Sequence, residues 1–352
     1  MAWPSVRLTR RLWRPPAEAN MTRDLTIEGI TARPGERVRG QISVLELADG
    51  STVQLPLVLI NGTTPGPRLY IGAGIHGDEV TGIALVNRAL AGIDPQTLSG
   101  SVVCCPVQQP LALVADHRLP ISQYLKSPLD QAPTDAWTCF PGDTDGNIAQ
   151  VMAATLFKLI RQCDAGIDVH TPTRGGRYVP IAILPHMNLG EAAQKAERMA
   201  HLLGTGWIMR GDRGMYVSDG ILCVEATKAG VPCLTFEIAE GGRLEEDQVA
   251  IGAQCVTNLL IGLGMIEGNP VPPPQSHVMR EFIGLRANRG GLLVAEAPLG
   301  AAVKAGDVLC RILNVYGDEV ETVTAPQDAL LVRSTTLGSV SKGERVATLG
   351  LL

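Results

Sequence analysis

The chain has 352 residues, of which 45% are hydrophobic and 18% charged, so it can bury a sizeable core and does not have the composition of a disordered chain. Its formal net charge is −5, and no basic block interrupts the body of the chain, which argues against a nucleic-acid partner. Because no apolar stretch has the length of a membrane span, we also expect no membrane partner and a soluble protein.

The eight cysteines form no CxxC pair, and most of them lie in apolar stretches such as SVVCCPV and VPCLTF. Disulfide frameworks are typical of small secreted chains, and this chain is not small. We therefore expect buried, reduced thiols and a cytoplasmic protein.

The N-terminal segment differs from the rest of the chain. Its first twenty residues, MAWPSVRLTRRLWRPPAEAN, carry four arginines and two adjacent prolines, and they lack the apolar core of a secretory signal. Met21 immediately precedes sequence of globular character. We expect residues 1–24 to be an N-terminal extension that is either disordered or wrongly included ahead of the true start. An organelle transit peptide is left open, as is whether Met21 is the true start.

Strands and helices alternate from about residue 25 onward. The sequence predicts strands over 52–62, 67–75, 101–107, 165–170, 179–185 and 231–238, and helices over 79–93, 147–163, 190–204, 221–228 and 246–263. Asp143 or Thr144 is placed to cap the second of these helices. Residues 108–142 are predicted to form a long loop, which in a compact domain is usually functional. Alternating strands and helices indicate an α/β fold with a mostly parallel or mixed sheet flanked by helices.

The composition changes near residue 270. Four prolines within residues 270–274 cannot continue a helix, so residues 269–275 are predicted to be a linker. Beyond it, residues 276–352 contain short strands and glycine turns. We therefore expect an α/β domain over residues 25–268 and a smaller all-β C-terminal domain over 276–352.

The segment GIHGDEVTG, residues 74–82, is the clearest candidate for metal binding. His76 and Glu79 are three residues apart and would face the same way on one helical turn. A hydrolytic zinc ion takes three such ligands, and His170, at the end of a predicted strand, is the candidate for the third. Asp168 could accept the N–H of a ligating imidazole. The spacing alone leaves open that His76 and Glu79 are a solvated surface pair.

Glu237 lies at the predicted end of a buried apolar strand, VPCLTFEI. An ionised carboxylate is costly to bury there, so its pKa would be raised, which suits a general base. The alternative is a structural ion pair with an arginine in the next loop, such as Arg243.

Four motifs of this chain together resemble the succinylglutamate desuccinylase/aspartoacylase family, a branch of the zinc carboxypeptidase superfamily. They are HGDE, the distant strand end DVH, FPG after a long loop, and TFE after VP. The resemblance spans most of residues 40–350 and implies a zinc carboxypeptidase-like α/β fold. It implies one zinc ion per subunit, with His76, Glu79 and His170 as the ligands. It also implies that Glu237 is the general base that activates the zinc water.

The chain departs from this family just before FPG. The family has an Asp-Leu-Asn-Arg run whose Asn and Arg hold the substrate carboxylate, whereas this chain reads DAWTCFPG. Asp135, Trp137 and Thr138 stand at the Asp, Asn and Arg positions. A neutral hydroxyl cannot replace the bidentate guanidinium, so we expect a less cationic, more apolar pocket beside Trp137 and Thr138.

Other arginines could take over part of this work. Arg118 resembles the family arginine that stabilises the oxyanion. Arg174 and Arg177, in TPTRGGRY, could stabilise the oxyanion or bind a substrate anion.

The C-terminal part also resembles a biotinyl/lipoyl-like hammerhead. The corresponding stretch, VETV at residues 320–323, has no lysine to carry a lipoyl or biotinyl group. We expect this part to shape the pocket rim or an oligomer contact, so a homo-oligomer is left open.

These observations predict a zinc-dependent amidohydrolase, a deacylase that cleaves the amide bond of a small N-acylated amino acid or amine. A metallocarboxypeptidase acting on short peptides is the second interpretation. A catalytically silent ligand-binding homologue is the third.

Overall fold

The computed structural model describes residues 23–121 and 135–352, so the predicted N-terminal extension lies almost wholly outside the described residues. The strands are β1 Leu25–Ile27, β2 Ile30–Ala32, β3 Glu36–Glu46, β4 Thr52–Asn61, β5 Thr64–Ala73, β6 Ser99–Cys105, β7 Ala165–His170, β8 Gly176–Ile183, β9 Trp207–Met209, β10 Cys233–Glu240, β11 His277–Met279, β12 Glu281–Arg286, β13 Gly291–Ala295, β14 Ala302–Val303, β15 Val308–Leu313, β16 Glu319–Thr324, β17 Ala329–Thr335, β18 Ser339–Val340 and β19 Arg345–Leu351. The helices are α1 Val80–Ala91, α2 Pro110–Val114, α4 Ile148–Ile160, α5 Glu191–Leu203, α6 Leu222–Lys228 and α7 Glu246–Gly262, with short 3₁₀ turns η1 Ala136–Thr138, η2 Met187–Leu189 and η3 Met215–Val217.

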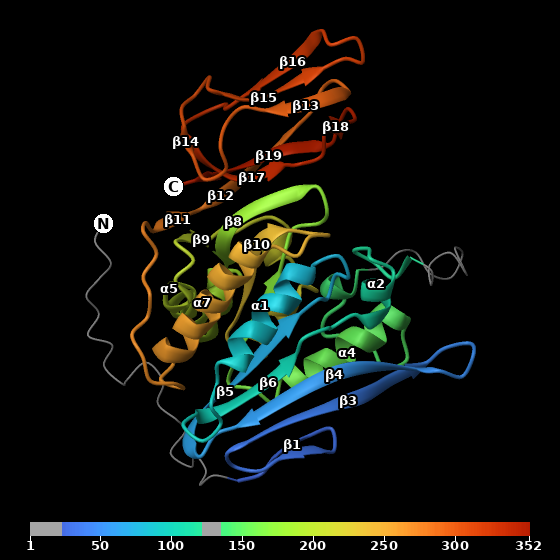
Figure 1. Cartoon of the computed structure of the whole chain (residues 1–352), viewed down its shortest axis with the longest axis vertical. Coiled ribbons are helices and arrows are strands. Elements are labelled where there is room, and N and C mark those ends of the chain that lie inside the picture. The colour runs from blue at the N-terminus through green and yellow to red at the C-terminus, as the bar shows by residue number, and fades with distance from the viewer. Residues whose placement is uncertain (1–22, 122–134) are drawn as a thin grey trace.

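One large mixed sheet forms the centre of the molecule (Figure 1). Its strand order is β12-β19-β17-β8-β10-β7-β5-β6-β4-β3, and β9, β11 and β14 pair beside this path. The four central strands β6, β5, β7 and β10 run parallel, and strands on both sides of them are antiparallel. Parallel strands need both faces covered, which explains their continuous apolar sequences.

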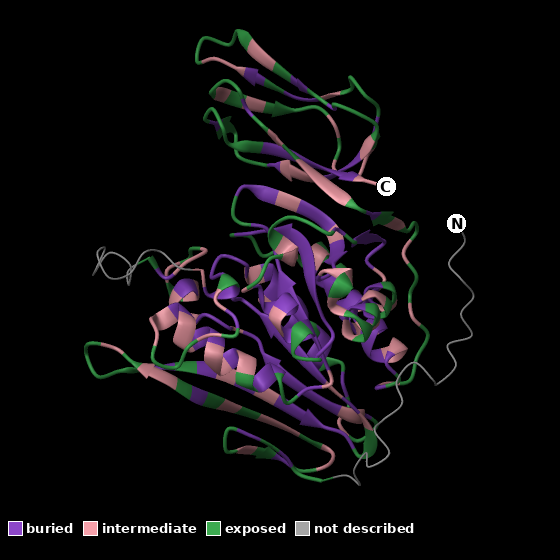
Figure 2. Cartoon of the chain, turned by 180° about the vertical axis from the view of Figure 1, so that it is seen from behind, coloured by how far each residue is buried: buried purple, intermediate pink, exposed green. Residues whose placement is uncertain are grey.

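Helices cover both faces of this sheet. Helices α1, α5 and α7 pack with Leu69 and Ile71 of β5 in one core, and α4 and α6 pack with Tyr70 in a second core on the opposite face. Alternation along a strand sends neighbouring side chains to opposite faces, so one strand serves both cores. Figure 2 shows the resulting concentration of buried residues in the central strands and between the helices. The predicted α/β class, with flanking helices and an all-β C-terminal region, is confirmed.

The C-terminal region divides between two sheets. Strands β13, β15, β16 and β18 form a separate four-stranded sheet, whose β16 contains the VETV stretch. Strands β12, β17 and β19 instead extend the large sheet, because β17 pairs antiparallel with β8. Strand β11 pairs with β9. Strand pairing therefore crosses the predicted linker, and the domain boundaries near residues 268 and 276 stay a prediction.

Two local predictions were wrong. Helix α1 begins at Val80, so His76 and Glu79 lie in the turn before it and not on a helical turn. Helix α4 is capped by Asn147, whose side chain accepts from two backbone N–H groups while Gln150 bonds back to the Asn147 N–H, so neither Asp143 nor Thr144 is the cap.

All eight cysteines are unpaired and seven are buried, as the sequence predicted. None of the helices in residues 23–121 and 135–352 combines the length and apolar character that a membrane crossing requires.

Candidate metal centre and active site

The turn between β5 and α1 places the first two candidate ligands. Gly74 has a φ of +61°, and the Glu79 N–H donates to the His76 carbonyl over 3.2 Å. A Cβ on Gly77 would lie 1.9 Å from the carbonyl carbon of Ala112, so only glycine fits against α2 there. This tight turn brings His76 Nδ1 to 2.7 Å from Glu79 Oε1.

The third candidate ligand comes from the end of β7. His170 Nδ1 lies 3.0 Å from Glu79 Oε2, and the same oxygen accepts the Thr171 N–H over 3.1 Å. One donor atom from each of His76, Glu79 and His170 lies within 4.8 Å of the others, and all three residues are buried. The sequence interpretation as a surface pair is therefore wrong, because these side chains point inward at a common centre.

Each imidazole is oriented by a carboxylate that contacts its Nε2 atom, on the side of the ring away from Glu79. His170 Nε2 lies 2.6 Å from Asp168 Oδ2, and His76 Nε2 lies 3.1 and 3.2 Å from the two oxygens of Asp135. Each ring thus has one nitrogen held by a carboxylate and the other nitrogen, Nδ1, facing Glu79. Two imidazoles and one carboxylate with such partners behind them are a donor set that fits Zn²⁺.

The charges around this cluster favour a cation. Burial lowers the pKa of His170, but the Asp168 and Glu79 carboxylates outweigh it and raise the pKa well above its ordinary value. Burial raises the pKa of Glu79, but His76 and His170 outweigh it and lower the pKa. With both imidazoles neutral, as metal binding requires, the three carboxylates of Glu79, Asp135 and Asp168 outweigh the single Arg118 guanidinium, and a divalent cation would balance the remaining negative charge.

Glu237 lies on β10, directly beside His170 in the parallel register. Its Oε1 accepts the Tyr216 hydroxyl over 2.7 Å, and its buried Oε2 has no hydrogen-bond partner among the described residues. Burial raises the pKa of Glu237, partly offset by His170. Two details of the sequence interpretation were wrong: β10 continues three residues beyond Glu237, and Arg243 lies 3.6 Å from Glu240 instead of pairing with Glu237.

Arg118 reaches the cluster from the segment after α2. Its Nε and Nη2 donate to Asp135 Oδ2 over 3.1 and 2.8 Å. Its Nη1 lies 3.9 Å from Glu79 Oε1 and 3.5 Å from Thr173 Oγ1. One edge of the guanidinium is therefore held by Asp135, and the remaining nitrogen faces the cluster.

Trp137 forms an aromatic wall beside the cluster, whereas Thr138 does not. The Trp137 side chain is buried, with ring centroids 5.9 Å from His76, 5.4 Å from His170 and 5.5 Å from Tyr216. Thr138 is exposed, and its hydroxyl donates to the Asp135 carbonyl over 2.9 Å. The predicted apolar character beside the FPG turn thus comes from Trp137.

Arg174 and Arg177 are engaged elsewhere. Arg174 Nη2 donates to Asp116 over 2.7 Å, and its side chain is about half exposed. Arg177 Nη1 donates to Glu245 over 2.7 Å. The described contacts of both guanidinium groups are with carboxylates outside the metal cluster, so their role in substrate binding stays a prediction.

The sequence did not predict three contacts at the site. Tyr216 holds Glu237, and Asp135 holds both His76 and Arg118. Tyr216 lies in a glycine-rich stretch without periodicity, so nothing in the sequence marks it. For Asp135, the resemblance of DAWTCFPG to the family motif marked the position but not these contacts.

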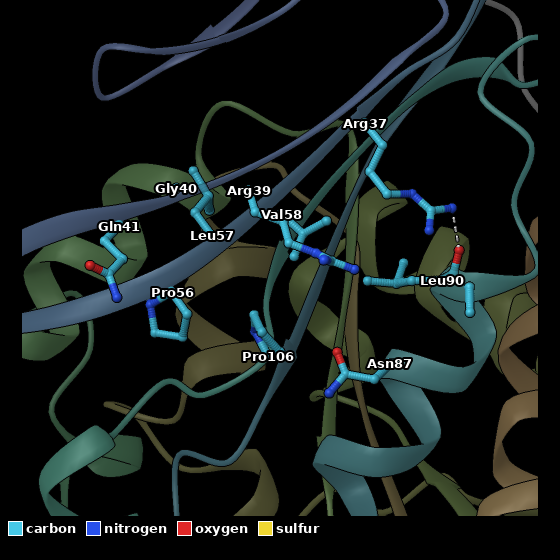
Figure 3. A pocket seen from close by; sticks show the side chains of 11 residues that line it. Arg37, Arg39, Gly40, Gln41, Pro56, Leu57, Val58, Asn87, Leu90 and Pro106 are labelled. Atoms are coloured by element: carbon cyan, nitrogen blue, oxygen red, sulfur yellow. Dashed lines mark hydrogen bonds between the residues drawn. The ribbon is translucent and has the colours of Figure 1, made fainter.

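A surface pocket of the protein lies away from this chemistry (Figure 3). It has a volume of about 740 Å³ and lies between β3, β4 and α1, with no residue of the metal cluster in its lining. Arg37 at its edge donates to the carbonyls of Leu90 and Ile93 at the end of α1. This pocket therefore has no part in the candidate active site.

The mixed sheet carries a buried two-histidine, one-glutamate cluster with a carboxylate on the next strand, an arrangement that offers a donor set for a metal ion. The succinylglutamate desuccinylase/aspartoacylase catalytic domain matches residues 65–263, more than half of the chain. The chain belongs to this family, as the resemblance implied, and is a hydrolase of non-peptide carbon–nitrogen bonds.

Individual relatives agree with this assignment. The chain is 23% identical over 306 residues to the N-alpha-acetyl-L-2,4-diaminobutyric acid deacetylase of Halomonas elongata, covering 84% of this chain and 85% of that protein. Its fold matches the product-bound ectoine utilization protein EutE (DoeB) of Ruegeria pomeroyi, with a TM-score of 0.77, 20% identity and coverage of 90% and 95% of the two chains. A succinylglutamate desuccinylase/aspartoacylase of Rhodobacter sphaeroides gives a TM-score of 0.76 at 23% identity, with coverage of 90% and 95%.

Proposed function

We propose that the protein is a zinc-dependent deacylase that hydrolyses the amide bond of a small N-acylated amino acid. The observation that carries the proposal is the convergence of His76, Glu79 and His170, with an unpartnered oxygen of Glu237 on the neighbouring strand. A metal-ligand set with a free carboxylate beside it is what hydrolysis by an activated water requires.

Zinc held by His76, Glu79 and His170 would polarise the acyl carbonyl and lower the pKa of a bound water toward about 7. Glu237 accepts the proton of the attacking water and delivers it to the leaving amine, because its raised pKa suits both directions of transfer. Arg118 offers Nη1 to the oxygen that becomes negative during the attack. Trp137 excludes water from the histidine side of the site.

The acyl group is proposed to be small, with acetyl as the first candidate. The Halomonas elongata relative is a deacetylase. In this chain, buried Trp137 occupies space beside the histidines, and exposed Thr138 offers no cation for the second carboxylate of a succinyl group. These features favour acetyl-amino acids over succinylglutamate, and they weigh against a peptidase that binds a peptide carboxylate at this position.

The test combines metal analysis with turnover of a panel of N-acetyl and N-succinyl amino acids. The wild-type protein is expected to hold about one zinc ion per chain and to release acetate. His76→Ala and His170→Ala should lose zinc and activity together, because each removes one of three ligands. Glu237→Gln should keep zinc while kcat falls by about 10²-fold or more.

His201→Ala is the matched control, because His201 is exposed on α5 and should leave zinc and turnover unchanged. Full zinc occupancy and normal turnover in His76→Ala would refute the metal site. A protein that binds zinc but releases no acid or amine from any member of the panel would refute the deacylase activity.

A further inference from the structure

Among the described residues, Arg333 lacks a carboxylate partner of the kind that three other arginines near the site, Arg118, Arg174 and Arg177, have. The partners of the others are at short range: Arg118 with Asp135 at 2.8 Å, Arg174 with Asp116 at 2.7 Å, and Arg177 with Glu245 at 2.7 Å. Arg333, on β17, forms no ion pair with any described residue, and its buried Nη1 has no hydrogen-bond partner there. A largely buried cation without an anion is costly, so its position requires an explanation.

Arg333 is held in a defined position. It lies directly opposite Tyr178 in the antiparallel register of β17 and β8. A Cβ on Gly176 would lie 2.2 Å from Arg333 Nη2 and 2.7 Å from its Cζ, so the guanidinium rests on the bare backbone of Gly176. Burial lowers the pKa of Arg333, partly offset by Tyr178, as expected for a cation whose charge is incompletely balanced.

Strand pairing places Arg333 near the proposed general base. Tyr178, opposite Arg333, is paired on its other side with Ala239, two residues beyond Glu237 on β10, and Glu237 accepts the Tyr216 hydroxyl. In the sheet, β17, β8, β10 and β7 are consecutive neighbours, so Arg333, Tyr178, Glu237 and His170 come from adjacent strands. At about 4.8 Å per strand, the backbones of β17 and β7 are about 14 Å apart. Because side chains extend from both strands, the distance between their functional groups is shorter and matches the length of a small N-acyl amino acid.

We propose that Arg333 binds the carboxylate of the substrate. This inference rests on the proposed deacylase function and narrows it to N-acyl amino acids as opposed to neutral N-acyl amines. With the acyl carbonyl at the His76, Glu79 and His170 cluster, the carboxylate lies toward β17, and the guanidinium can bind it with two parallel hydrogen bonds. Thr138 supplies no cation on its side of the site. Arg333, in the C-terminal region, thus supplies one from another side.

The experiment compares Nα-acetyl-L-2,4-diaminobutyrate with its primary carboxamide, which lacks only the carboxylate charge. Arg333→Met should lower kcat/KM for the acid about ten- to hundred-fold, the effect of one lost charge-assisted hydrogen-bonding group, through KM rather than kcat. Turnover of the carboxamide should not change. Arg333→Lys should restore part of the preference for the acid, because it returns the charge without the planar fork.

Calorimetric titration with zinc-loaded Glu237→Gln protein measures binding without turnover. The acid should bind more tightly than the carboxamide, and adding Arg333→Met should abolish that difference. Gly176→Ala tests the same geometry with Arg333 intact: its methyl group displaces the guanidinium and should weaken acid binding, whereas backbone φ at this position needs no glycine. Equal melting temperatures exclude misfolding of the variants.

Arg289→Met is the matched control, because Arg289 is an exposed arginine in the turn between β12 and β13 of the same C-terminal region and should leave the preference intact. Equal binding of acid and carboxamide by the Glu237→Gln protein, or an acid preference that survives Arg333→Met, would overturn the assignment of Arg333. A wild-type protein that binds the acid through Arg333 but hydrolyses no N-acyl amino acid would refute the deacylase proposal alone.

Discussion

The surroundings of Glu237, the proposed general base, decide how readily it takes up a proton. Burial raises its pKa, the neighbouring His170 lowers it, and the hydroxyl of Tyr216 also lowers it by donating to Oε1. The second oxygen, Oε2, is left free to accept a proton. Tyr216 therefore positions one oxygen and lowers the pKa of the carboxyl group, and its own ring packs edge-on against the ring of Trp137.

Tyr216→Phe tests this positioning. The phenol donates to the ionised carboxylate, so its loss destabilises the ionised form and raises the pKa of Glu237 further. Because the base works only when ionised, activity rises with pH through this pKa, and the acid limb of the kcat/KM profile should move to higher pH. Tyr316→Phe, at an exposed residue of the C-terminal region, is the control. An acid limb that stays in place would show that Tyr216 does not act on the base.

At the scale of elements, the turn before α1 carries two of the three proposed metal ligands. The backbone of this turn packs directly against the backbone of α2. Only glycine at position 77 permits this, since any Cβ on Gly77 would overlap the backbone of α2. The proposed ligands His76 and Glu79 flank this contact, so their separation depends on how tightly the turn packs against Ala112. The sequence spacing alone could not show this, because α2 lies more than thirty residues further along the chain.

Gly77→Ala should therefore loosen the metal site. The added methyl group forces the turn away from α2, with an overpacking cost of about 1–3 kcal/mol, and it should lower the melting temperature and weaken zinc binding together. Gly92→Ala, at the other end of α1, meets only the Ala89 carbonyl at 3.5 Å and serves as the control. Unchanged zinc affinity in Gly77→Ala would contradict a turn that depends on this contact.

The elements themselves were largely predictable, because their signals are local. Helix α7 and strand β7 lie within a residue of their predicted ranges, since apolar periodicity and continuous apolar runs fix them. The resemblance to the family then pointed to His76, Glu79, His170 and Glu237, which lie together in the structure and whose roles stay a proposal. The features that the sequence did not predict depend on contacts between distant segments. They are the start of α1, the contact of Asp135 with His76, the hydrogen bond of Tyr216 to Glu237, and the pairing of Arg333 with Tyr178.

At the scale of the whole molecule, the C-terminal region is bound to the catalytic part through the sheet. Strand β17 continues the sheet beyond β8, and one hydrophobic core joins Tyr178 and Ile181 of β8 with Leu330 and Val332 of β17. The Thr336 hydroxyl also donates to Glu240 over 2.7 Å, at the end of the strand that carries Glu237. A change in β17 should thus reach the active site.

Val332→Asp tests this coupling, because Val332 is 0% exposed in the core shared by β8 and β17. An unpaired charge buried there should destabilise the chain by about 4 kcal/mol or more. If the two parts fold as one unit, calorimetry should show a single transition at lower temperature, with zinc released in that same transition. Val294→Asp, on a 41% exposed residue of β13 in the separate four-stranded sheet, should change little. Two separate transitions in Val332→Asp, with zinc retained through the first, would instead show that the C-terminal region unfolds on its own and that the site does not depend on β17.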